Sequence, residues 1–527
     1  SPVTQTQRTY NYRELRDSVA RFAGVLRQLG VEKGDTVVIY MPMIPETLVA
    51  MHACARIGAI HSVVFGGFAA RELAIRIDDT RPKVLLTASA GKEGDRVIDY
   101  LSIVNEAFEH TEYAPQRCVV LQRDFHRVEL QSDRDLDWDE IGRDSAPAAW
   151  VEMDATDPLY ILYTSGTTGK PKGIVRDNGG HAVAMKYSMT AIYDARPGEV
   201  FWAASDVGWV VGHSYIVYGP LIQGCTTVLY EGKPIRTPDA GAFWRVVADY
   251  DVRVMFTAPT AIRAIKREDP EGQLGSQYDT SGLRYLFLAG EHCDAATLQW
   301  AEQMLQVPVI DHWWQTESGW PMVANSVGVE RLPIKPGSAS KPVCGYDLHV
   351  LDAAGRELPA GKEGSLVIRL PLPPGCLTNL WRDPERLKHA YFTTYPGYYH
   401  CGDGGYVDDD GYVYITGRLD DVINVAGHRL STTTMEEVVA AHPAVADCAV
   451  IGTAHELKGQ VPIGLVVLKA DAHIDPVDIE RDVVAMVRER IGPVASFKHV
   501  VVVKQLPKTR SGKILRRTIR CIAEGES

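Results

Sequence analysis

The chain has 527 residues, of which 45% are hydrophobic and 23% charged, and 67 acidic against 55 basic side chains give a formal net charge of −12. A chain of this length exceeds one hydrophobic core, so we expect two or three globular domains, and the acidic balance argues against a general nucleic-acid-binding protein. Nine cysteines without a C-x-x-C pair, no signal-peptide pattern and no membrane-length apolar run predict a reducing compartment, the cytoplasm or the mitochondrial matrix.

The first two thirds of the sequence alternate short apolar runs with amphipathic stretches. The apolar runs predict buried strands at residues 37–42, 62–67, 83–88, 118–121, 159–164, 226–231, 252–258 and 283–290. Helical patterns lie between them, as at residues 45–58 and 179–193. Strands that alternate with helices favour parallel, doubly wound α/β sheets.

The pattern changes after about residue 346. Residues 346–418 carry shorter runs broken by Gly, Pro and Asp, which predict a more antiparallel β region. The following segment has its own strand patterns at 446–452 and 464–469 and a helical pattern at 478–492. We therefore predict a large N-terminal domain over residues 1–419 and a small α+β domain over residues 420–527.

The stretch YTSGTTGKPKG, residues 163–173, combines glycines, hydroxyl side chains and lysines. Such residues let backbone N–H groups, hydroxyls and ammonium groups converge on a phosphate. The stretch departs from the P-loop pattern, because only two residues separate Gly166 from Gly169 and Pro171 follows Lys170. From this stretch alone, a flexible surface linker is the alternative.

A resemblance to a known family rests on five stretches in fixed order: TSGTTGKPKG, DHWWQTESG (311–319), YHCGDGG (399–405), ITGRLDDVINVAGHRL (415–430) and LPKTRSGKILRR (506–517). Together they resemble the motifs of the adenylate-forming acyl-CoA synthetases over nearly the whole chain. The segments MPMIPETLVAMHACARIGAIHSVVFGGFAA, DVGWVVGHSYIVYGPL and APTAIRA are most similar to the acetyl- and propionyl-CoA synthetase branch. Members usually carry a further stretch before the equivalent of Thr9, so we expect that this stretch is truncated or disordered.

This resemblance implies a two-step reaction with ATP, Mg²⁺ and coenzyme A (CoA). A short carboxylic acid and ATP form acyl-AMP and pyrophosphate, and the CoA thiol then displaces AMP to give a thioester. In the implied site Asp403 holds the ribose hydroxyls, while Thr316 at the α-phosphate and Glu317 at Mg²⁺ are catalytic. The implied ATP site comprises Thr164, Ser165, Gly166, Thr167, Thr168, Gly169, Lys170, Gly290, Glu291, His292, Asp311, His312, Trp313, Gln315, Thr316, Asp403, Arg418 and Arg429. His292 replaces a proline that acetyl-type members commonly carry.

The catalytic lysine implied by the resemblance is Lys513, which bridges the carboxylate and the α-phosphate in the first step. Asp420 matches the hinge about which the small domain rotates, which withdraws Lys513 and brings Ala426 and Gly427 to the CoA tunnel. The family lysine is an acetylation target, so an acetyltransferase or a deacetylase is an expected partner. Without the matching motif, a lysine in this basic segment would be interpreted as a solvated surface charge.

The CoA contacts and a second metal site also come from the resemblance. Gly67, Arg96 and Arg488 match positions that contact CoA, although Glu93 stands where acetyl-type enzymes carry an arginine. His442 matches a position assigned to structural Mg²⁺ with adjacent carbonyls. A histidine that only ends a helix is the alternative.

Five positions bear on the length of the acid. Trp314 matches the tryptophan that walls the acyl pocket of short-chain members, and Val210 and Val211 line the same pocket. Ala289 falls where acetate-specific relatives carry valine, which leaves space for about one more carbon, and Trp320 matches the propionyl branch. We therefore expect propionate over acetate, with an ordinary core residue as the alternative reading of Ala289.

Other functions share parts of these motifs. An amino-acid adenylating module would need an acidic group for the substrate amine and a following carrier domain, and neither is apparent. An acetoacetyl-CoA synthetase would lack the Trp314 wall in this form. A non-enzymatic nucleotide-binding protein would have lost Lys513, Asp403 or Thr316. Acetyl-CoA synthetase is therefore the nearest alternative.

Overall fold

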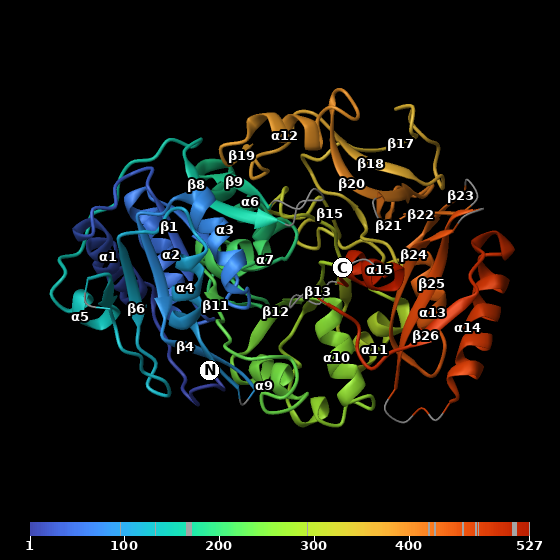
Figure 1. Ribbon diagram of the computed structural model, residues 1–527, viewed down its shortest axis with the longest axis horizontal. Helices are drawn as coiled ribbons and strands as arrows, with labels where there is room; N and C mark the ends of the chain where they lie inside the picture. The colour runs from blue at the N-terminus through green and yellow to red at the C-terminus, as the bar shows by residue number, and fades with distance from the viewer. Residues whose placement is uncertain are drawn as a thin grey trace.

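The computed structural model describes residues 1–94, 96–131, 133–164, 171–291, 293–419, 422–425, 428–455, 458–469, 472, 474–508 and 514–525, without the side chains of residues 422, 424, 428, 429, 494 and 517. Figure 1 shows the N-terminal sheets at the left and centre and the C-terminal strands and helices at the right. No helix among the described residues is long and apolar enough to cross a membrane.

The first sheet contains eight strands with a parallel centre. In spatial order it comprises β19 (Asn379–Leu380), β9 (Lys172–Asp177), β8 (Pro158–Thr164), β2 (Ile60–Val63), β1 (Thr36–Tyr40), β3 (Val84–Ala88), β6 (Arg117–Leu121) and β7 (Asp135–Asp137). Strands β8 to β7 pair in parallel, whereas β9 and β19 are antiparallel additions. Alternate residues of β1 enter two different hydrophobic cores, because both faces of the sheet are covered.

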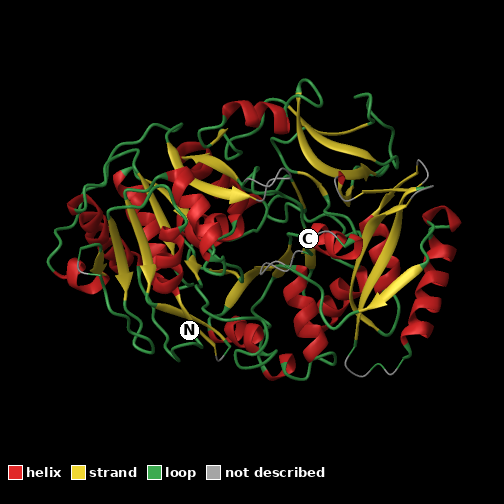
Figure 2. Cartoon of the chain, viewed as in Figure 1, coloured by secondary structure: helices red, strands yellow, loops and turns green. Residues whose placement is uncertain are grey.

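Helices alternate with these strands (Figure 2). They are α1 (Tyr12–Gln28), α2 (Pro45–Ile57), α3 (Ala70–Thr80), α4 (Tyr100–Glu109), α5 (Trp138–Arg143) and α6 (Asn178–Ala191). Local signals set several of their ends. Asn11 and Glu14 form a reciprocal capping box at the start of α1, while α2 begins at Pro45 and ends before Gly58, which has φ 75°.

The second sheet is wholly parallel, with the order β11 (Thr226–Thr227), β10 (Val200–Ala203), β12 (Val252–Thr257), β13 (Tyr285–Leu288) and β14 (Val309–Asp311). Its connections contain α7 (Val210–Gly212), the π-helical η1 (His213–Tyr218), α8 (Gly219–Gln223), α9 (Ala242–Asp249), α10 (Pro259–Glu268), η2 (Gly275–Gln277) and α11 (Ala295–Leu305). The carboxyl ends of β12, β13 and β14 therefore meet at one edge.

The third sheet is antiparallel, with the order β17 (Leu348–Leu351), β18 (Gly364–Arg369), β20 (Tyr398–Val407) and β21 (Val413–Arg418). Between β19 and β20 lies α12 (Pro384–Tyr391). Two small ribbons complete this part, β4 (Ala90–Glu93) with β5 (Arg96–Asp99) and β15 (Val323–Ala324) with β16 (Lys341–Pro342).

The C-terminal segment has a sheet and a hydrophobic core of its own. It contains β22 (Val422–Val425), β23 (His428–Ser431), β24 (Val445–His455), β25 (Gly459–Leu468) and β26 (His499–Val502), with α13 (Thr432–Ala440), α14 (Pro476–Arg490), the short η4 (Pro493–Ala495) and α15 (Arg516–Glu524). The Ser431 hydroxyl donates to the Thr416 carbonyl at 2.5 Å, which ties this segment to β21. The domain boundary at residue 420 stays a prediction.

The α/β fold class and most predicted strands are confirmed, but two strand assignments need correction and several strands were not predicted. The run at 62–67 is a strand only to Val63, because Val64 and Phe65 are buried while the chain already leaves the sheet. The run at 226–231 contributes only Thr226–Thr227. The strands β4, β5, β7, β9, β10 and β14 were not predicted. Apolarity indicates burial, and a buried residue is not always part of a strand.

Four interior histidines lie where α2, β2, α6 and η1 meet: His52, His61, His181 and His213. The rings of His61 and His213 stack with centroids 5.4 Å apart, and Nε2 of His61 lies 2.6 Å from the Tyr218 hydroxyl. Burial lowers the pKa of His52 and His213 to about 4 and those of His61 and His181 well below the usual value. These rings are therefore neutral at pH 7.

Because these histidines are neutral in the folded protein, we expect its free energy of unfolding to fall in mild acid. In the unfolded chain a histidine binds its proton near pH 6.5, whereas folded His213 binds it only near pH 4. The free energy of unfolding therefore has its full value above pH 6.5 and falls as the pH drops toward 4. Between pH 7.5 and pH 5, His213→Gln should reduce the loss of unfolding free energy by roughly 1–2 kcal/mol, measured by urea denaturation. The exposed His110→Gln is the control, and equal losses in all three proteins would contradict the prediction.

Candidate active site

The candidate site begins at the carboxyl end of β14. Asp311 ends this strand, and residues 312–319 then cross toward the third sheet. The backbone N–H of Trp313 donates to the Val323 carbonyl at 2.9 Å, which fixes the path of this segment. The segment DHWWQTESG thereby carries its side chains from the second sheet to β20.

Asp403 of β20 is the polar centre of the site. The residue is 6% exposed, and Oδ2 accepts hydrogen bonds from Nε1 of Trp313 at 3.1 Å and Nε2 of Gln315 at 2.6 Å. Its cross-strand partner Arg418 places Nη1 3.4 Å from Oδ1. A buried carboxylate needs such donors, because burial removes its hydration. The structure thus brings four of the predicted nucleotide residues together.

Gln315 connects this centre to the aromatic side chain of Tyr399. Besides Asp403, its Nε2 donates to the Cys401 carbonyl at 2.7 Å, and its Oε1 accepts from the Tyr399 hydroxyl at 2.9 Å. Both ends of the amide are therefore engaged. This holds the neighbouring Thr316 and Glu317 at a fixed distance from Asp403.

The side chain of Arg176 binds the backbone of the same segment. The guanidinium is fully buried and donates to the backbone carbonyls of Thr316, Gly375 and, at 3.0 Å, Glu317. Gly319, at φ 75°, is part of this arrangement, since a Cβ there would lie 2.6 Å from Cζ of Arg176. Sequence reasoning missed Arg176, although an arginine inside the apolar run GIVR was a usable signal.

The carboxylate of Glu317 is engaged at one oxygen. Its Oε1 accepts from the Tyr391 hydroxyl at 2.5 Å and lies 3.8 Å from Nζ of Lys172, whose ammonium donates to the same hydroxyl at 2.6 Å. Within the described part of the chain, Oε2 accepts no hydrogen bond. Lys172 and Tyr391 were not predicted as site residues. Lys172 could have been found, because it lies in the glycine-rich stretch.

The glycine-rich stretch connects two antiparallel strands, and the last paired residues are Thr164 of β8 and Lys172 of β9. The predicted residues Ser165, Gly166, Thr167, Thr168, Gly169 and Lys170 lie outside the described residues. Oγ1 of Thr164 is buried and has no hydrogen-bond partner in the described part of the chain. The stretch therefore ends at Lys172 beside Glu317, and Thr164 is the strand partner of Lys172.

The predicted adenine side lies after β13. Glu291 pairs with Arg263 of α10 at 2.6 Å and accepts a hydrogen bond from the Thr260 hydroxyl, whereas His292 lies outside the described residues. His312 is committed to the interior, because Nδ1 bonds to the Leu288 carbonyl at 2.6 Å and Nε2 to the Tyr193 hydroxyl at 2.9 Å. Burial lowers the pKa of His312 to about 4, so the ring is neutral.

The predicted acyl-pocket residues share one hydrophobic core. Trp314 is 9% exposed and packs edge-on against Tyr215, with ring centroids 5.4 Å apart, and at 6.1 Å from Phe256. Ala289 belongs to the same core, and partly buried Val210 and Val211 pack against it. Trp320 lies elsewhere in this core, where its indole N–H donates to the Pro374 carbonyl at 3.0 Å.

The remaining predicted residues are not brought together. Arg488 is exposed on α14, and Arg96 is exposed on the β4–β5 ribbon at the opposite end of the molecule (Figure 1). Gly67 lies in the turn after β2. His442 follows α13, and its Nδ1 accepts from the Ala444 N–H at 3.2 Å. Asp420, Ala426, Gly427, Lys513 and the side chain of Arg429 lie outside the described residues.

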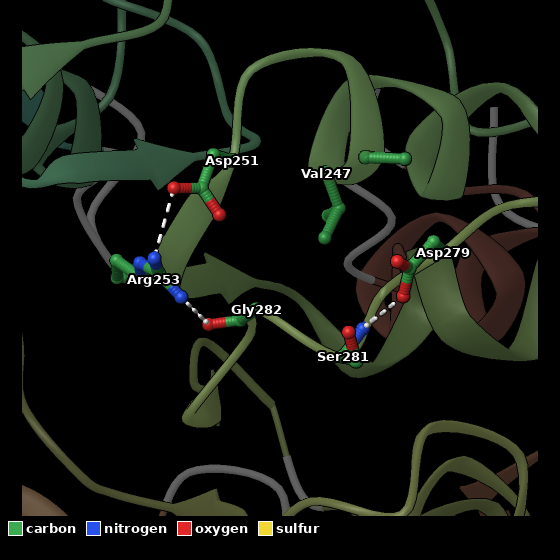
Figure 3. Close-up of a pocket in the computed structure, with 7 residues that line it drawn as sticks. Val247, Asp251, Arg253, Asp279, Ser281 and Gly282 are labelled. Carbon is green, nitrogen blue, oxygen red and sulfur yellow. Dashed lines mark hydrogen bonds and ion pairs between the residues drawn. The ribbon is translucent and has the colours of Figure 1, made fainter.

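Two further observations concern ligand binding. The described residues contain no group of three or more His, Cys, Asp or Glu side chains arranged to hold a metal ion. Figure 3 shows a polar pocket lined by α9, the start of β12 and residues 279–282, away from the site, where Arg253 pairs with Asp251 at 2.9 Å and donates to the Gly282 carbonyl. Asp279 accepts from the Ser281 N–H there, so these polar groups already have partners.

Comparisons with known proteins agree with this geometry. The profile of the family described as AMP-binding enzyme matches residues 2–373, and that of the AMP-binding enzyme C-terminal domain matches residues 434–513. The mouse protein named acyl-CoA synthetase short-chain family member 3, mitochondrial, is 52% identical over all of this chain and 77% of its own length. The Escherichia coli protein named propionate–CoA ligase is 45% identical over all of this chain and 84% of its own length. A solved anthranilate CoA ligase in complex with anthranoyl-AMP has a TM-score of 0.84 and 24% identity, covering 98% of this chain and 92% of that one.

The Asp403 centre predicts a strong effect on nucleotide binding. Asp403→Ala removes an acceptor for two buried donors and the carboxylate expected to hold the ribose. Because a hydrogen bond to a charged group contributes about 1.5–3 kcal/mol, the Kd for AMP should rise by roughly 10- to 100-fold in calorimetric titration. Asp408→Ala removes a carboxylate from the turn after β20, where it pairs with Lys335 at 2.6 Å, and should leave the Kd unchanged. Equal effects of the two variants would refute the assignment.

Proposed function

Because the chain belongs to the AMP-binding enzyme family, as an AMP-forming acid–thiol ligase of the short-chain acyl-CoA synthetases, we propose that propionate is its preferred acid. The reaction joins a short-chain carboxylate to CoA through an acyl-AMP. The carboxylate oxygen attacks the α-phosphorus of ATP and pyrophosphate leaves. The CoA sulfur then attacks the acyl carbon, its proton is released, and AMP leaves.

The preference for propionate is supported by the composition of the acyl-site core. Trp314, Tyr215 and Phe256 form a rigid aromatic wall whose rings contact one another. Ala289 belongs to the same core, and its backbone N–H donates to the carbonyl of Thr257, the residue after Phe256, at 3.3 Å. A large indole excludes long chains, while a methyl side chain leaves room for a third carbon. The relative from Escherichia coli named propionate–CoA ligase supports the same reading.

The residues around Glu317 and Asp403 have distinct proposed roles. Asp403 would hold the ribose, and the ammonium of Lys172 with the loop after Thr164 would stabilise the charge of the departing pyrophosphate. Lys513 would bridge the acid and the α-phosphate. Charge that develops on phosphate oxygens is best stabilised by donors already in place, and the fixed Thr316–Glu317 backbone provides such preorganisation.

The residues present fit a magnesium ion that arrives with the nucleotide. Mg²⁺ is usually held by one or two carboxylates together with substrate phosphates and water. Glu317 offers an oxygen without a hydrogen bond from the described residues, and Oγ1 of Thr164 is buried without a partner there. When bound, the ion would neutralise phosphate charge. We propose Glu317 as its protein ligand and give no such role to His442, whose Nδ1 accepts a backbone hydrogen bond.

The acid preference is tested at Ala289. Burial of one methylene contributes roughly 0.8 kcal/mol, and a pocket distinguishes acids by one carbon about 10- to 200-fold. Propionate should therefore exceed acetate in kcat/KM by about such a factor. Ala289→Val fills the space of the third carbon, so kcat/KM for propionate should fall while that for acetate stays level or rises. Pyrophosphate release with both acids measures the ratio.

The control is Ala248→Val on α9, which adds the same two methyl groups in another part of the fold. It should leave the propionate-to-acetate ratio unchanged. A wild-type preference for acetate, or an unchanged ratio in Ala289→Val, would show that Ala289 does not set the length of the acid. A wild-type preference for acetate would make the enzyme an acetyl-CoA synthetase.

The two-step mechanism is tested at Lys513. Charge develops at the α-phosphate only in the first step, so Lys513→Ala should abolish acyl-AMP formation yet retain most thioester formation from supplied acyl-AMP. The half-reactions are measured separately, by pyrophosphate release and by acyl-CoA formation. Lys504→Ala, an exposed lysine of the same basic segment, should affect neither. An equal loss in both half-reactions would contradict the domain rotation.

A further inference from the structure

Helix α12 and the residues before it contact the end of the glycine-rich stretch, where the chain enters β9. Before this helix, β19 pairs with β9, and the backbone N–H of Trp381 donates to the Gly173 carbonyl at 2.8 Å. Within it, Nη1 of Arg386 donates to the Pro171 carbonyl at 3.2 Å. Pro171 and Gly173, which follow the predicted phosphate-binding residues, are therefore held by hydrogen bonds from Arg386 and Trp381.

Tyr391 ends α12 and places its hydroxyl between two opposite charges. The hydroxyl donates to Oε1 of Glu317 at 2.5 Å and accepts from Nζ of Lys172 at 2.6 Å. The same ammonium lies 4.5 Å from the centroid of the phenol ring. The Tyr391 side chain is 5% exposed and stacks on Tyr399 with centroids 5.5 Å apart. Packing therefore contributes to its orientation beside the two hydrogen bonds.

The Tyr391 hydroxyl lies between the Lys172 ammonium and the Glu317 carboxylate, which do not hydrogen-bond to each other directly. Nζ of Lys172 and Oε1 of Glu317 are 3.8 Å apart, beyond hydrogen-bond distance. In a site of low polarity such a pair would otherwise form a short ion pair, because the attraction grows as the atoms approach. Burial and the Glu317 charge raise the pKa of Tyr391, so the phenol keeps the proton that it donates.

We propose that Tyr391 is a positioning residue that holds Glu317 and Lys172 apart and oriented for magnesium-bound nucleotide. This proposal rests on the proposed function. The phenol does not contact the reacting atoms. It leaves Oε2 of Glu317 without a hydrogen bond from the described residues, so that this oxygen can bind the ion, and it sets the position of the Lys172 ammonium. Without the hydroxyl, the ammonium and the carboxylate would close on each other, and that contact would have to break before the metal-bound phosphates could enter.

The test is Tyr391→Phe, which keeps the ring, the stack on Tyr399 and the ring contact with Lys172. Calorimetric titration with Mg·ATP should give a Kd raised by about tenfold. Titrations with AMP, and with ATP in excess EDTA, should be nearly unchanged, because the Asp403 centre is untouched. The magnesium concentration for half-maximal acyl-AMP formation should rise, with KM for the acid unaltered.

Tyr395→Phe is the matched control, since it removes a buried hydroxyl that bonds to Ser365 at 2.9 Å. It should bind all three ligands like the wild type. A double-mutant cycle adds Glu317→Gln, in which Tyr391→Phe should no longer change Mg·ATP binding, because the carboxylate charge is gone. Equal weakening of AMP and Mg·ATP binding, or additive effects in the cycle, would overturn the proposal and leave Tyr391 a merely structural residue.

The two proposals fail in different ways. If the wild-type protein forms no acyl-CoA from any short acid, the proposed function fails, and the calorimetric comparison still decides the role of Tyr391. If the wild type is active and Tyr391→Phe binds Mg·ATP normally, only the role of Tyr391 is refuted.

Discussion

The fully buried guanidinium of Arg176 is the constraint on which the site depends. A buried cation must be surrounded by acceptors, and here these are backbone carbonyls of Thr316, Glu317 and Gly375. The arginine belongs to β9 of the first sheet, the first two acceptors follow the second sheet, and the third precedes β19. One side chain thus joins segments from different parts of the chain, and the site segment cannot shift without leaving this charge unpaired.

The polar groups of the site form two centres that are connected by an amide and two aromatic rings. At one end Asp403 gathers Trp313, Gln315 and Arg418. At the other, Glu317 lies beside Lys172 and Tyr391. Gln315 hydrogen-bonds to Tyr399, and Tyr399 stacks on Tyr391. A nucleotide that spans both ends would find its ribose and phosphate partners at a fixed separation, so little of its binding free energy is lost in ordering them.

The sequence alone predicted the fold class, many of the strands and several residues of the site. Hydrophobic periodicity predicted the parallel strands and the antiparallel region, because burial on one or two faces leaves a period in the chain. The motifs predicted Asp403, Gln315, Trp313 and Arg418 as one set, and the structure places them in contact. Sequence misjudged the end of β2, where Val64 and Phe65 are buried outside a strand. It also did not reveal β7, β9, β10 and β14; in β9 the charged Arg176 interrupts an apolar pattern.

Only the tertiary structure decided the partners of these residues. That His312 directs its ring into the core, whereas its neighbour Trp313 reaches Asp403, depends on where β13 and β20 lie in space. Tyr391 is 219 residues from Lys172 along the chain, and no local pattern marks their contact. Residue types and spacing determined the chemistry that is available, because they reflect burial and local backbone needs. The fold decided which groups meet, because contacts between distant segments depend on the packing of whole sheets and helices.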